Sequence, residues 1–175
     1  MSPARKYQND DATPREIGDL LRTHSTRPSE DVATFCDALV FNWLIGGTDG
    51  HAKNYSVLHG KGGRVRLAPL YDLGSALPYF RDAHRLKLAM KIGDHYRLNE
   101  IGRRDWEKLA GALALRSRDV LARIDERAER IPQLASSIAE ELARQGLTHP
   151  LLDVLRAELS ARARERARSV RPQRS

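Results

Sequence analysis

Three polar residues near the middle of the chain have the types and spacing of a site for nucleotide phosphates. Asp49 and Asn54 are the ends of the segment Asp-Gly-His-Ala-Lys-Asn, and Asp72 begins a later Asp-Leu-Gly. In kinase-type phosphoryl transfer, one Asp orients the attacking hydroxyl, an Asn five positions later helps to hold Mg²⁺, and a second Asp beyond a hairpin also holds Mg²⁺. The order of these residues therefore indicates phosphoryl-transfer chemistry.

Each of these residues also has an ordinary structural interpretation. The pair Asp49-Gly50 is typical of turns, and Asn54 can fix a loop through backbone hydrogen bonds. Asp72 can be a cap or turn residue, His51 a packed or solvent-facing histidine, and Lys53 a surface charge. The ordered set favours a phosphate site more than any one member does.

Other site chemistries fit the same region less well. His51, His59 and Asp49 suggest a metal site, but the chain has no His-Glu-x-x-His motif and only one cysteine, Cys36. The Gly-x-Ser-x-Gly motif of many hydrolases is also absent. The glycine-rich segment 60–63 lacks a Gly-Lys-Ser/Thr ending, and we interpret it as a hairpin turn.

The elements that must position Asp49, Asn54 and Asp72 are a buried helix and a hairpin. Thr13-Pro14 predicts a helix start, and apolar residues at helical spacing predict a second helix over 29–45, buried on most sides and ended by Gly46-Gly47. Acidic residues in its first turn suit the helix dipole. Short strands are predicted at 55–58 and 64–67, and their hairpin returns the chain to Asp72.

From about residue 82 onward, the sequence predicts helices almost throughout. The expected helices cover 105–115, 117–130, a segment opened by Pro132, and 151–168. We therefore expect a mainly α fold with one short β-hairpin. The expected organisation is a polar N-terminal segment with a short helix over 1–28, a principal domain over 6–168, and a basic, Arg-rich tail over 161–175.

The net charge of +7 is concentrated at the end of the chain. Residues 156–175 contain seven arginines and two glutamates, whereas the remainder is nearly balanced. We interpret this basic tail as a solvated helix end, with binding of an anionic partner as the alternative. A single thiol, no run of apolar residues long enough for a membrane span, and no apolar signal segment predict a cytoplasmic protein.

The segment Phe-Asn-Trp-Leu-Ile-Gly-Gly-Thr-Asp-Gly-His-Ala-Lys-Asn at 41–54 resembles the catalytic segment of HipA-type serine/threonine kinases, the toxins of bacterial toxin–antitoxin pairs. Pro-Leu-Tyr-Asp at 69–72 resembles their metal-binding segment, and Lys6-Tyr7 and Leu86–Met90 are also similar. The resemblance implies a kinase-like C-lobe that uses ATP and Mg²⁺. It implies Asp49 as catalytic base, Asn54 and Asp72 as Mg²⁺ ligands, and a nucleotide surface that includes His51, Ala52, Lys53 and Tyr71.

The same resemblance implies partners. These are a helix-turn-helix antitoxin whose complex binds operator DNA, and a protein substrate such as an aminoacyl-tRNA synthetase. The family's N-lobe supplies a phosphate loop and a strand lysine, which we do not find in these 175 residues. Three interpretations follow: a C-lobe completed by a separately encoded N-lobe, an inactive truncated kinase, or a non-catalytic module that binds an antitoxin or DNA. We expect a kinase to depend on Asn54 and Asp72 and to tolerate loss of 161–175. We expect a binding module to need the tail or a helix face and to tolerate Asp49→Asn.

Overall fold

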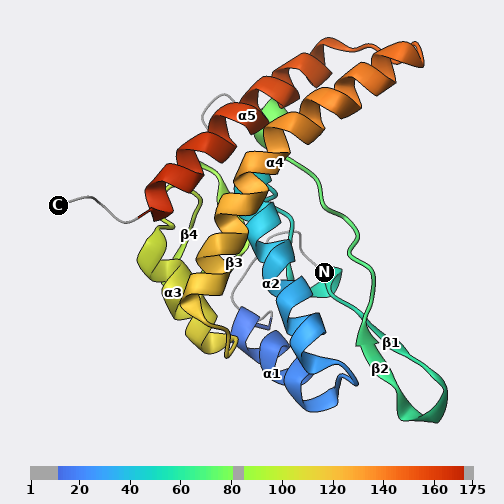
Figure 1. Cartoon of the computed structure of the whole chain (residues 1–175), viewed down its shortest axis with the longest axis vertical. Coiled ribbons are helices and arrows are strands. Elements are labelled where there is room, and N and C mark those ends of the chain that lie inside the picture. The colour runs from blue at the N-terminus through green and yellow to red at the C-terminus, as the bar shows by residue number, and fades with distance from the viewer. Residues whose placement is uncertain (1–11, 81–84, 172–175) are drawn as a thin grey trace, which may run out of the picture.

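The computed structural model describes residues 12–80 and 85–171, and it shows a mainly helical fold with two short antiparallel hairpins (Figure 1). The predicted fold class is confirmed. Residues 1–11 and 172–175, including Lys6-Tyr7 and the end of the expected tail, lie outside the described residues. The helices are α1 (Pro14–His24), α2 (Pro28–Ile45), α3 (Arg103–Ala112), α4 (Ser117–Arg144) and α5 (Pro150–Val170); the strands are β1 (Val57–His59), β2 (Val65–Leu67), β3 (Lys87–Ile92) and β4 (His95–Arg97).

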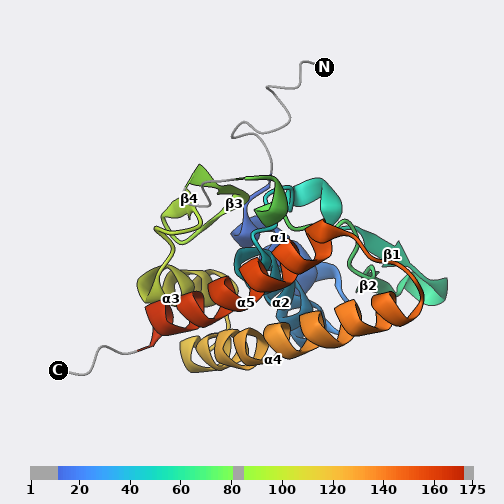
Figure 2. The same cartoon turned by 90° about the horizontal axis from the view of Figure 1, so that it is seen from above.

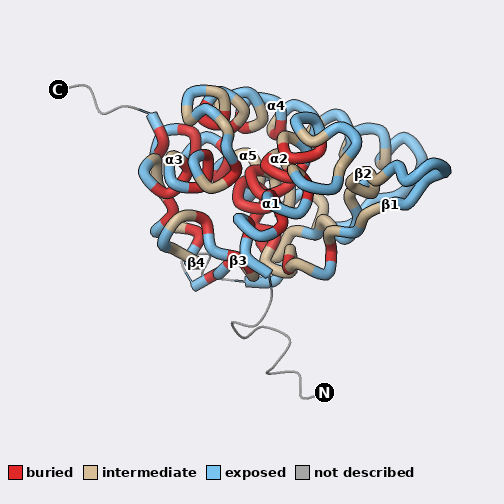
Figure 3. The backbone as a smooth tube through the Cα atoms, turned by 90° about the horizontal axis from the view of Figure 1, so that it is seen from below, coloured by how far each residue is buried: buried red, intermediate tan, exposed pale blue. Residues whose placement is uncertain are grey.

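Helix α2 is the central element of the core. Helix α1 precedes it and begins as predicted, with a capping box between Thr13 and Glu16 and a proline in the first turn. Helix α2 has buried residues around most of its circumference, including Phe35 and Trp43, and it contacts α1, α4 and α5. The tube coloured by burial shows the buried backbone gathered around α2 (Figure 3). Because α2 is enclosed by the other helices, its ends are fixed points for the loops that leave it.

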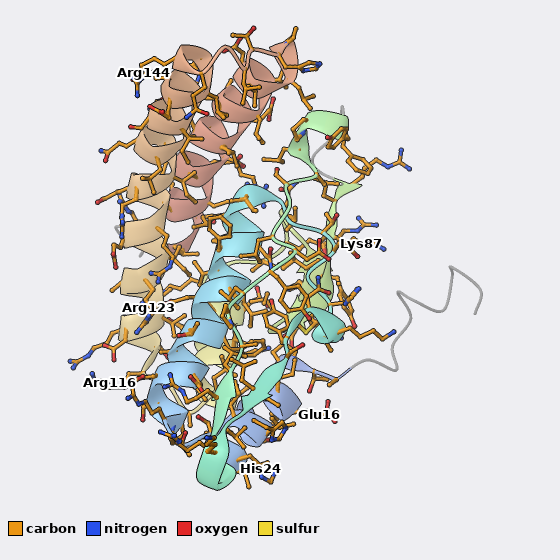
Figure 4. The ribbon with its side chains drawn as sticks, turned by 90° about the vertical axis from the view of Figure 1, so that its right-hand side faces the viewer. Glu16, His24, Lys87, Arg116, Arg123 and Arg144 are labelled. Atoms are coloured by element: carbon orange, nitrogen blue, oxygen red, sulfur yellow. The ribbon has the colours of Figure 1, made fainter. Side chains whose placement is uncertain are left out.

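Helices α4 and α5 form a long antiparallel pair along one side of the molecule (Figures 1 and 2). Arg116, Arg123 and Arg144 mark α4 from its beginning to its far end (Figure 4). The predicted helix break at Pro132 is wrong, because α4 continues through that proline while α5 packs along it. None of the helices in the described part of the chain has the length and apolar character needed to cross a bilayer.

A second hairpin, β3–β4, replaces part of the predicted helical region. Leu88, Met90 and Ile92 are buried, whereas the alternating Lys87 and Lys91 are exposed. This alternation is the period of a half-buried strand, and it prevails over the high helix propensities of leucine, methionine and lysine. The expectation of helix from residue 82 onward is therefore wrong over Lys87–Arg97.

The Arg-rich end of the chain is only partly solvated. Within α5, Arg162 and Arg166 are buried together with Ala163, Ala167 and Val170, whereas Arg164 and Arg168 are exposed. The interpretation of this segment as a solvated helix end is wrong for the two buried arginines. Since one face of α5 is part of the core, we expect loss of residues 161–175 to destabilise the fold, contrary to the expectation from sequence.

Candidate active site

The loop that carries Asp49 starts at Gly46, which has a left-handed backbone conformation that favours glycine. Gly46 ends α2 with φ = 68°, and the N–H groups of Gly46 and Gly47 both donate to the Asn42 carbonyl. A Cβ at Gly46 would lie 2.8 Å from the Leu77 side chain. Glycine is therefore required here by both conformation and space, and it turns the chain sharply out of the helix.

The side chain of Asn42 packs against the backbone of the same loop. Cβ atoms at Gly47 and Gly50 would each lie 2.5 Å from the Asn42 side-chain amide, so the loop backbone rests directly on this buried residue. The Asn42 amide also donates to the Tyr55 hydroxyl at 3.4 Å. Sequence reasoning does not single out Asn42, although a polar residue within the apolar pattern of 29–45 is the signal that could have found it.

Asp49 and His51 lie together on the first turn of the loop. The His51 N–H donates to the Asp49 carbonyl at 2.9 Å, and His51 Nε2 lies 3.8 Å from Asp49 Oδ1. The Asp49 side chain is 48% exposed, but its Oδ1 is buried and makes no hydrogen bond to any of the described residues. Within the same ranges, His51 Nδ1 is likewise buried without a partner. Unsatisfied buried polar atoms are rare in folded proteins and are often found where a ligand binds.

Asn54 and Asp72 come together across the β1–β2 hairpin. The Asn54 side chain is 5% exposed and donates from Nδ2 to Asp72 Oδ2 at 2.7 Å. Its Oδ1 is buried and has no hydrogen-bond partner within residues 12–80 and 85–171. Asp72 is exposed and has φ = 58°, a left-handed conformation that is uncommon for residues other than glycine. This pair therefore combines the unsatisfied amide oxygen of Asn54 with the carboxylate of Asp72, a residue in the left-handed backbone conformation.

The segment after Asp72 is bound to the end of α2. Ser75 Oγ donates to the Ile45 carbonyl at 2.6 Å, and the Ala76 N–H donates to the Gly46 carbonyl at 3.1 Å. These carbonyls belong to the last turn of α2, where the helix itself provides no donors. The C-terminal end of α2 therefore fixes both the loop that carries Asp49 and the segment that carries Asp72.

The remaining residues predicted to contact nucleotide form the rim of this region. The Tyr71 hydroxyl donates to the Lys53 carbonyl at 2.9 Å and lies 3.0 Å from Ser56 Oγ. Ala52 is half-buried against the core, whereas the Lys53 side chain is exposed. The structure therefore brings Lys53 into this region through its backbone carbonyl, while its side chain is exposed.

A buried carboxylate at the other end of α2 holds the hairpin. Asp31 accepts hydrogen bonds from Ser25 Oγ (2.6 Å), the Leu67 N–H (2.8 Å) and the Arg66 guanidinium (3.0–3.2 Å). Burial alone would raise the pKa of Asp31, but the hydrogen bonds from Arg66, Ser25 and Leu67 outweigh it and lower the pKa. Asp31 thus anchors β2, the strand that leads back to Asp72.

Tyr55 anchors the loop that runs between Asn54 and β1. Its ring meets Phe35 of α2 edge to face, with 4.8 Å between centroids. Burial raises the pKa of Tyr55 to about 12, with a smaller opposing effect of the hydrogen bond from Asn42. The Tyr55 phenol is therefore neutral at physiological pH. The aromatic contact between Tyr55 and Phe35 packs the start of the hairpin against α2.

The donor atoms of the site suit a hard cation that also binds phosphate. Among the described residues, no three His, Cys, Asp or Glu side chains gather into a group that could hold a metal alone, which disfavours a site of His51, His59 and Asp49. Mg²⁺ prefers oxygen ligands and usually takes only one or two from the protein, with the others from water and phosphate. The unsatisfied Asn54 Oδ1 and the exposed Asp72 carboxylate fit that requirement.

The sequence of this chain is similar to those of known proteins. Residues 1–135 match the family model described as HipA-like C-terminal domain. Over 145 residues, or 80% of this chain, the sequence is 34% identical to the Sinorhizobium fredii protein named "Putative kinase Y4mE" and covers 34% of it. Over 149 residues, or 79% of this chain, it is 28% identical to the "Serine/threonine-protein kinase toxin HipA" of Shewanella oneidensis and covers 34% of it. The chain thus spans about a third of the length of these curated relatives.

A solved structure shares the fold. It is titled "Shewanella oneidensis MR-1 Toxin Antitoxin System HipA, HipB and its operator DNA complex", and the similarity has a TM-score of 0.74 at 23% sequence identity. The alignment covers 98% of this chain and 41% of the other. The shared fold therefore extends over nearly the whole of this chain.

Proposed function

Because the chain belongs to the family of HipA-like C-terminal domains, we propose that it is the nucleotide- and Mg²⁺-binding lobe of a HipA-type serine/threonine-protein kinase. The observation that carries this proposal is the Asn54–Asp72 hydrogen bond, together with the buried Asn54 Oδ1, which has no hydrogen-bond partner among the residues that the structure describes. Asp49, on the loop that follows the C-terminal end of α2, provides a second buried oxygen without a hydrogen-bond partner in the described part of the chain. Relatives named as kinases support the same chemistry.

In this proposal, each residue of the site has a distinct role. Asn54 and Asp72 hold Mg²⁺, which neutralises charge on the nucleotide phosphates when it is bound. Asp49 accepts the proton of the substrate hydroxyl, because its side chain is about half exposed and can therefore meet a substrate at the surface. His51, Ala52, Lys53 and Tyr71 line the nucleotide, with the Lys53 ammonium available to a phosphate.

The proposed partners follow from the family. An N-lobe completes the phosphate clamp, and a helix-turn-helix antitoxin binds the kinase and brings it to operator DNA. The substrate is a protein serine or threonine, with an aminoacyl-tRNA synthetase as one candidate. The complex of HipA with HipB and operator DNA, which shares this fold, supports the antitoxin and the indirect DNA contact.

Thermal unfolding with and without Mg²⁺-ATP tests the proposal. A ligand at 100 times its Kd stabilises by about 2.7 kcal/mol, which corresponds to a rise in Tm of about 5–10 °C for a chain of this size. We expect this rise to require Mg²⁺, to disappear in Asp72→Ala, and to persist in Asp49→Asn, because a base does not hold the nucleotide. Asp94→Ala, which changes an exposed aspartate in the β3–β4 turn, is the control and keeps the rise. Absence of a Mg²⁺-dependent rise at millimolar ATP would contradict the proposal.

One surface favours the alternative of a non-catalytic module that binds an anionic partner. A pocket of about 450 Å³ between α4 and α5 is lined by Arg164, Arg168 and Arg171 as well as Glu129. If DNA binding is the principal function, the affinity falls steeply with salt and is lost in a variant with both Arg164→Ala and Arg168→Ala. The DNA affinity would then also be unchanged in Asp49→Asn, and this result distinguishes the binding module from the kinase.

A further inference from the structure

The carbonyl of Trp43, in the last turn of α2, is not used by the helix itself. In a continuing helix the Gly47 N–H would donate to it, but that N–H donates to the Asn42 carbonyl at 2.7 Å. The Trp43 carbonyl instead accepts two hydrogen bonds from Arg162 of α5, at 3.1 Å from Nε and 2.8 Å from an Nη. A guanidinium here satisfies an orphan carbonyl and places positive charge at the negative end of the helix dipole.

Arg162 reaches this position at a cost. Arg162 is 5% exposed, and in the described part of the chain its hydrogen bonds go to a main-chain carbonyl and not to a carboxylate. Burial, together with repulsion from Arg166, lowers the pKa of Arg162 to about 10, although Glu165 opposes this. The side chain therefore remains charged at neutral pH. A buried charge persists only where hydrogen bonds and dipoles compensate for lost water, and the end of α2 supplies them.

The Trp43 side chain is fixed on its other side by a related contact. Trp43 Nε1 donates to the Leu98 carbonyl at 3.0 Å, and the Arg166 guanidinium approaches the same carbonyl at 3.5 Å. The Trp43 ring also meets Trp106 edge to face, with 5.2 Å between centroids. Arg162 of α5 thus binds the Trp43 carbonyl. Arg166 of α5 contacts the Leu98 carbonyl, which accepts the hydrogen bond from the Trp43 ring.

Movement at Trp43 would reach the candidate site within one turn of chain. Ile45 and Gly46 follow two and three positions later, and their carbonyls accept hydrogen bonds from Ser75 and Ala76 of the segment after Asp72. Gly46 also starts the loop to Asp49. The position of the α2 end therefore determines where both carboxylate-bearing segments lie.

We propose that Arg162 is a positioning residue for the candidate site, which it acts on through the Trp43 carbonyl and the end of α2. This inference rests on the proposed function for the meaning of the site. It places one determinant of the site in α5, outside the residues 1–135 that match the family model. Helix α5 is then more than a cover for the core, because it fixes the geometry of the loop with Asp49.

Amide hydrogen exchange of the full chain without nucleotide tests the role of Arg162. A hydrogen bond to a charged group contributes enough to change local opening by about tenfold or more. We expect Arg162→Met to speed exchange of amides in 46–54 and 74–77 about tenfold more than that of amides in 32–39, at the other half of α2. Arg162→Lys keeps the charge and a single donor, so its effect is smaller. Arg164→Met, the same change at an exposed position of α5, leaves all these rates unchanged.

Two results would overturn the inference. One is equal acceleration in both halves of α2, which would mean that Arg162 only stabilises the fold as a whole. The other is no acceleration in either variant. Because Arg162→Lys is measured in parallel, the test does not depend on folding of the methionine variant. The readout needs no nucleotide, so failure of Mg²⁺-ATP to stabilise the native chain counts against the proposed function alone.

Discussion

The two ends of α2 hold the candidate site by different means. At the N-terminal end, the side chain of Asp31 gathers Ser25, Arg66 and the Leu67 N–H around one carboxylate. At the C-terminal end, the backbone carbonyls of Trp43, Ile45 and Gly46 accept donors from other segments. The first end fixes the strand that leads to Asp72, and the second fixes the loops on which Asp49 and Asp72 lie.

This difference determines how each end responds to mutation. A contact made by a side chain can be removed by changing that side chain, with little change in the backbone around it. A contact made by a carbonyl can only be disturbed by changing the donor or the backbone conformation. At the N-terminal end of α2, we therefore expect stability to depend on Asp31 and on pH. At the C-terminal end, we expect stability to depend on Gly46 and on the side chains that donate to the carbonyls.

The largest effect is expected at Asp31. Asp31→Ala leaves the partly buried Leu67 N–H without its acceptor and the Arg66 guanidinium without its main partner. Loss of these hydrogen bonds to one buried carboxylate costs about 3 kcal/mol of unfolding free energy. Urea denaturation measures this loss. Glu30→Ala, which removes an exposed carboxylate that also pairs with Arg66, is expected to cost less than about 0.5 kcal/mol. Equal losses in the two variants would contradict the central position given to Asp31.

Gly46→Ala tests the other end of α2. The left-handed backbone and the close approach of the Leu77 side chain both oppose a Cβ, so we expect a loss of about 2 kcal/mol. Gly111→Ala in α3 is the matched control, because a Cβ at that position would meet no atom within 4 Å and alanine favours a helix. The control should be neutral or stabilising. If both changes have the same effect on urea denaturation, the conformation of Gly46 is not what holds the loop.

A dependence on pH is expected from Asp31. Because its pKa is lowered in the folded protein, its stabilising contribution is complete above its ordinary value of 3.8 and is lost as the pH falls through the lower folded pKa. The difference in unfolding free energy between the native chain and Asp31→Asn should therefore narrow below pH 3.8. The narrowing amounts to about 1.4 kcal/mol for each pH unit between the folded and unfolded pKa values. A constant difference from pH 6 to pH 2 would contradict this ionic role.

These contrasts also explain which features could be predicted from sequence. The apolar spacing of 29–45 and the Gly46-Gly47 pair predict α2 and its end correctly. Glu30 and Asp31 are predicted only as partners of the helix dipole, because sequence does not show that Arg66 and Leu67 fold back onto Asp31. The β3–β4 hairpin is not predicted although its alternation is visible, since leucine, methionine and lysine also favour helices.

For the candidate site, the types and spacing of Asp49, Asn54 and Asp72 predict the residues but not their relation. Asn54 donates a hydrogen bond to Asp72, and Asp72 has a left-handed conformation; no local sequence pattern specifies either feature. The role of Arg162 could not be predicted either. Its alternation with alanine and glutamate suggests a solvated helix, whereas tertiary packing places it on the Trp43 carbonyl.

The most direct test of the central claim is paramagnetic line broadening in the NMR spectrum of the ¹⁵N-labelled chain, with Mn²⁺-ATP in place of Mg²⁺-ATP. Mn²⁺ takes the same oxygen ligands and broadens amide signals close to it. If the end of α2 positions one nucleotide site, the strongest broadening falls on amides of 49–54 and 71–74 together, and it is lost in Asp72→Ala. Broadening centred on Arg164 and Arg168 in the α4–α5 pocket, with the signals of 49–54 unchanged, would contradict the account.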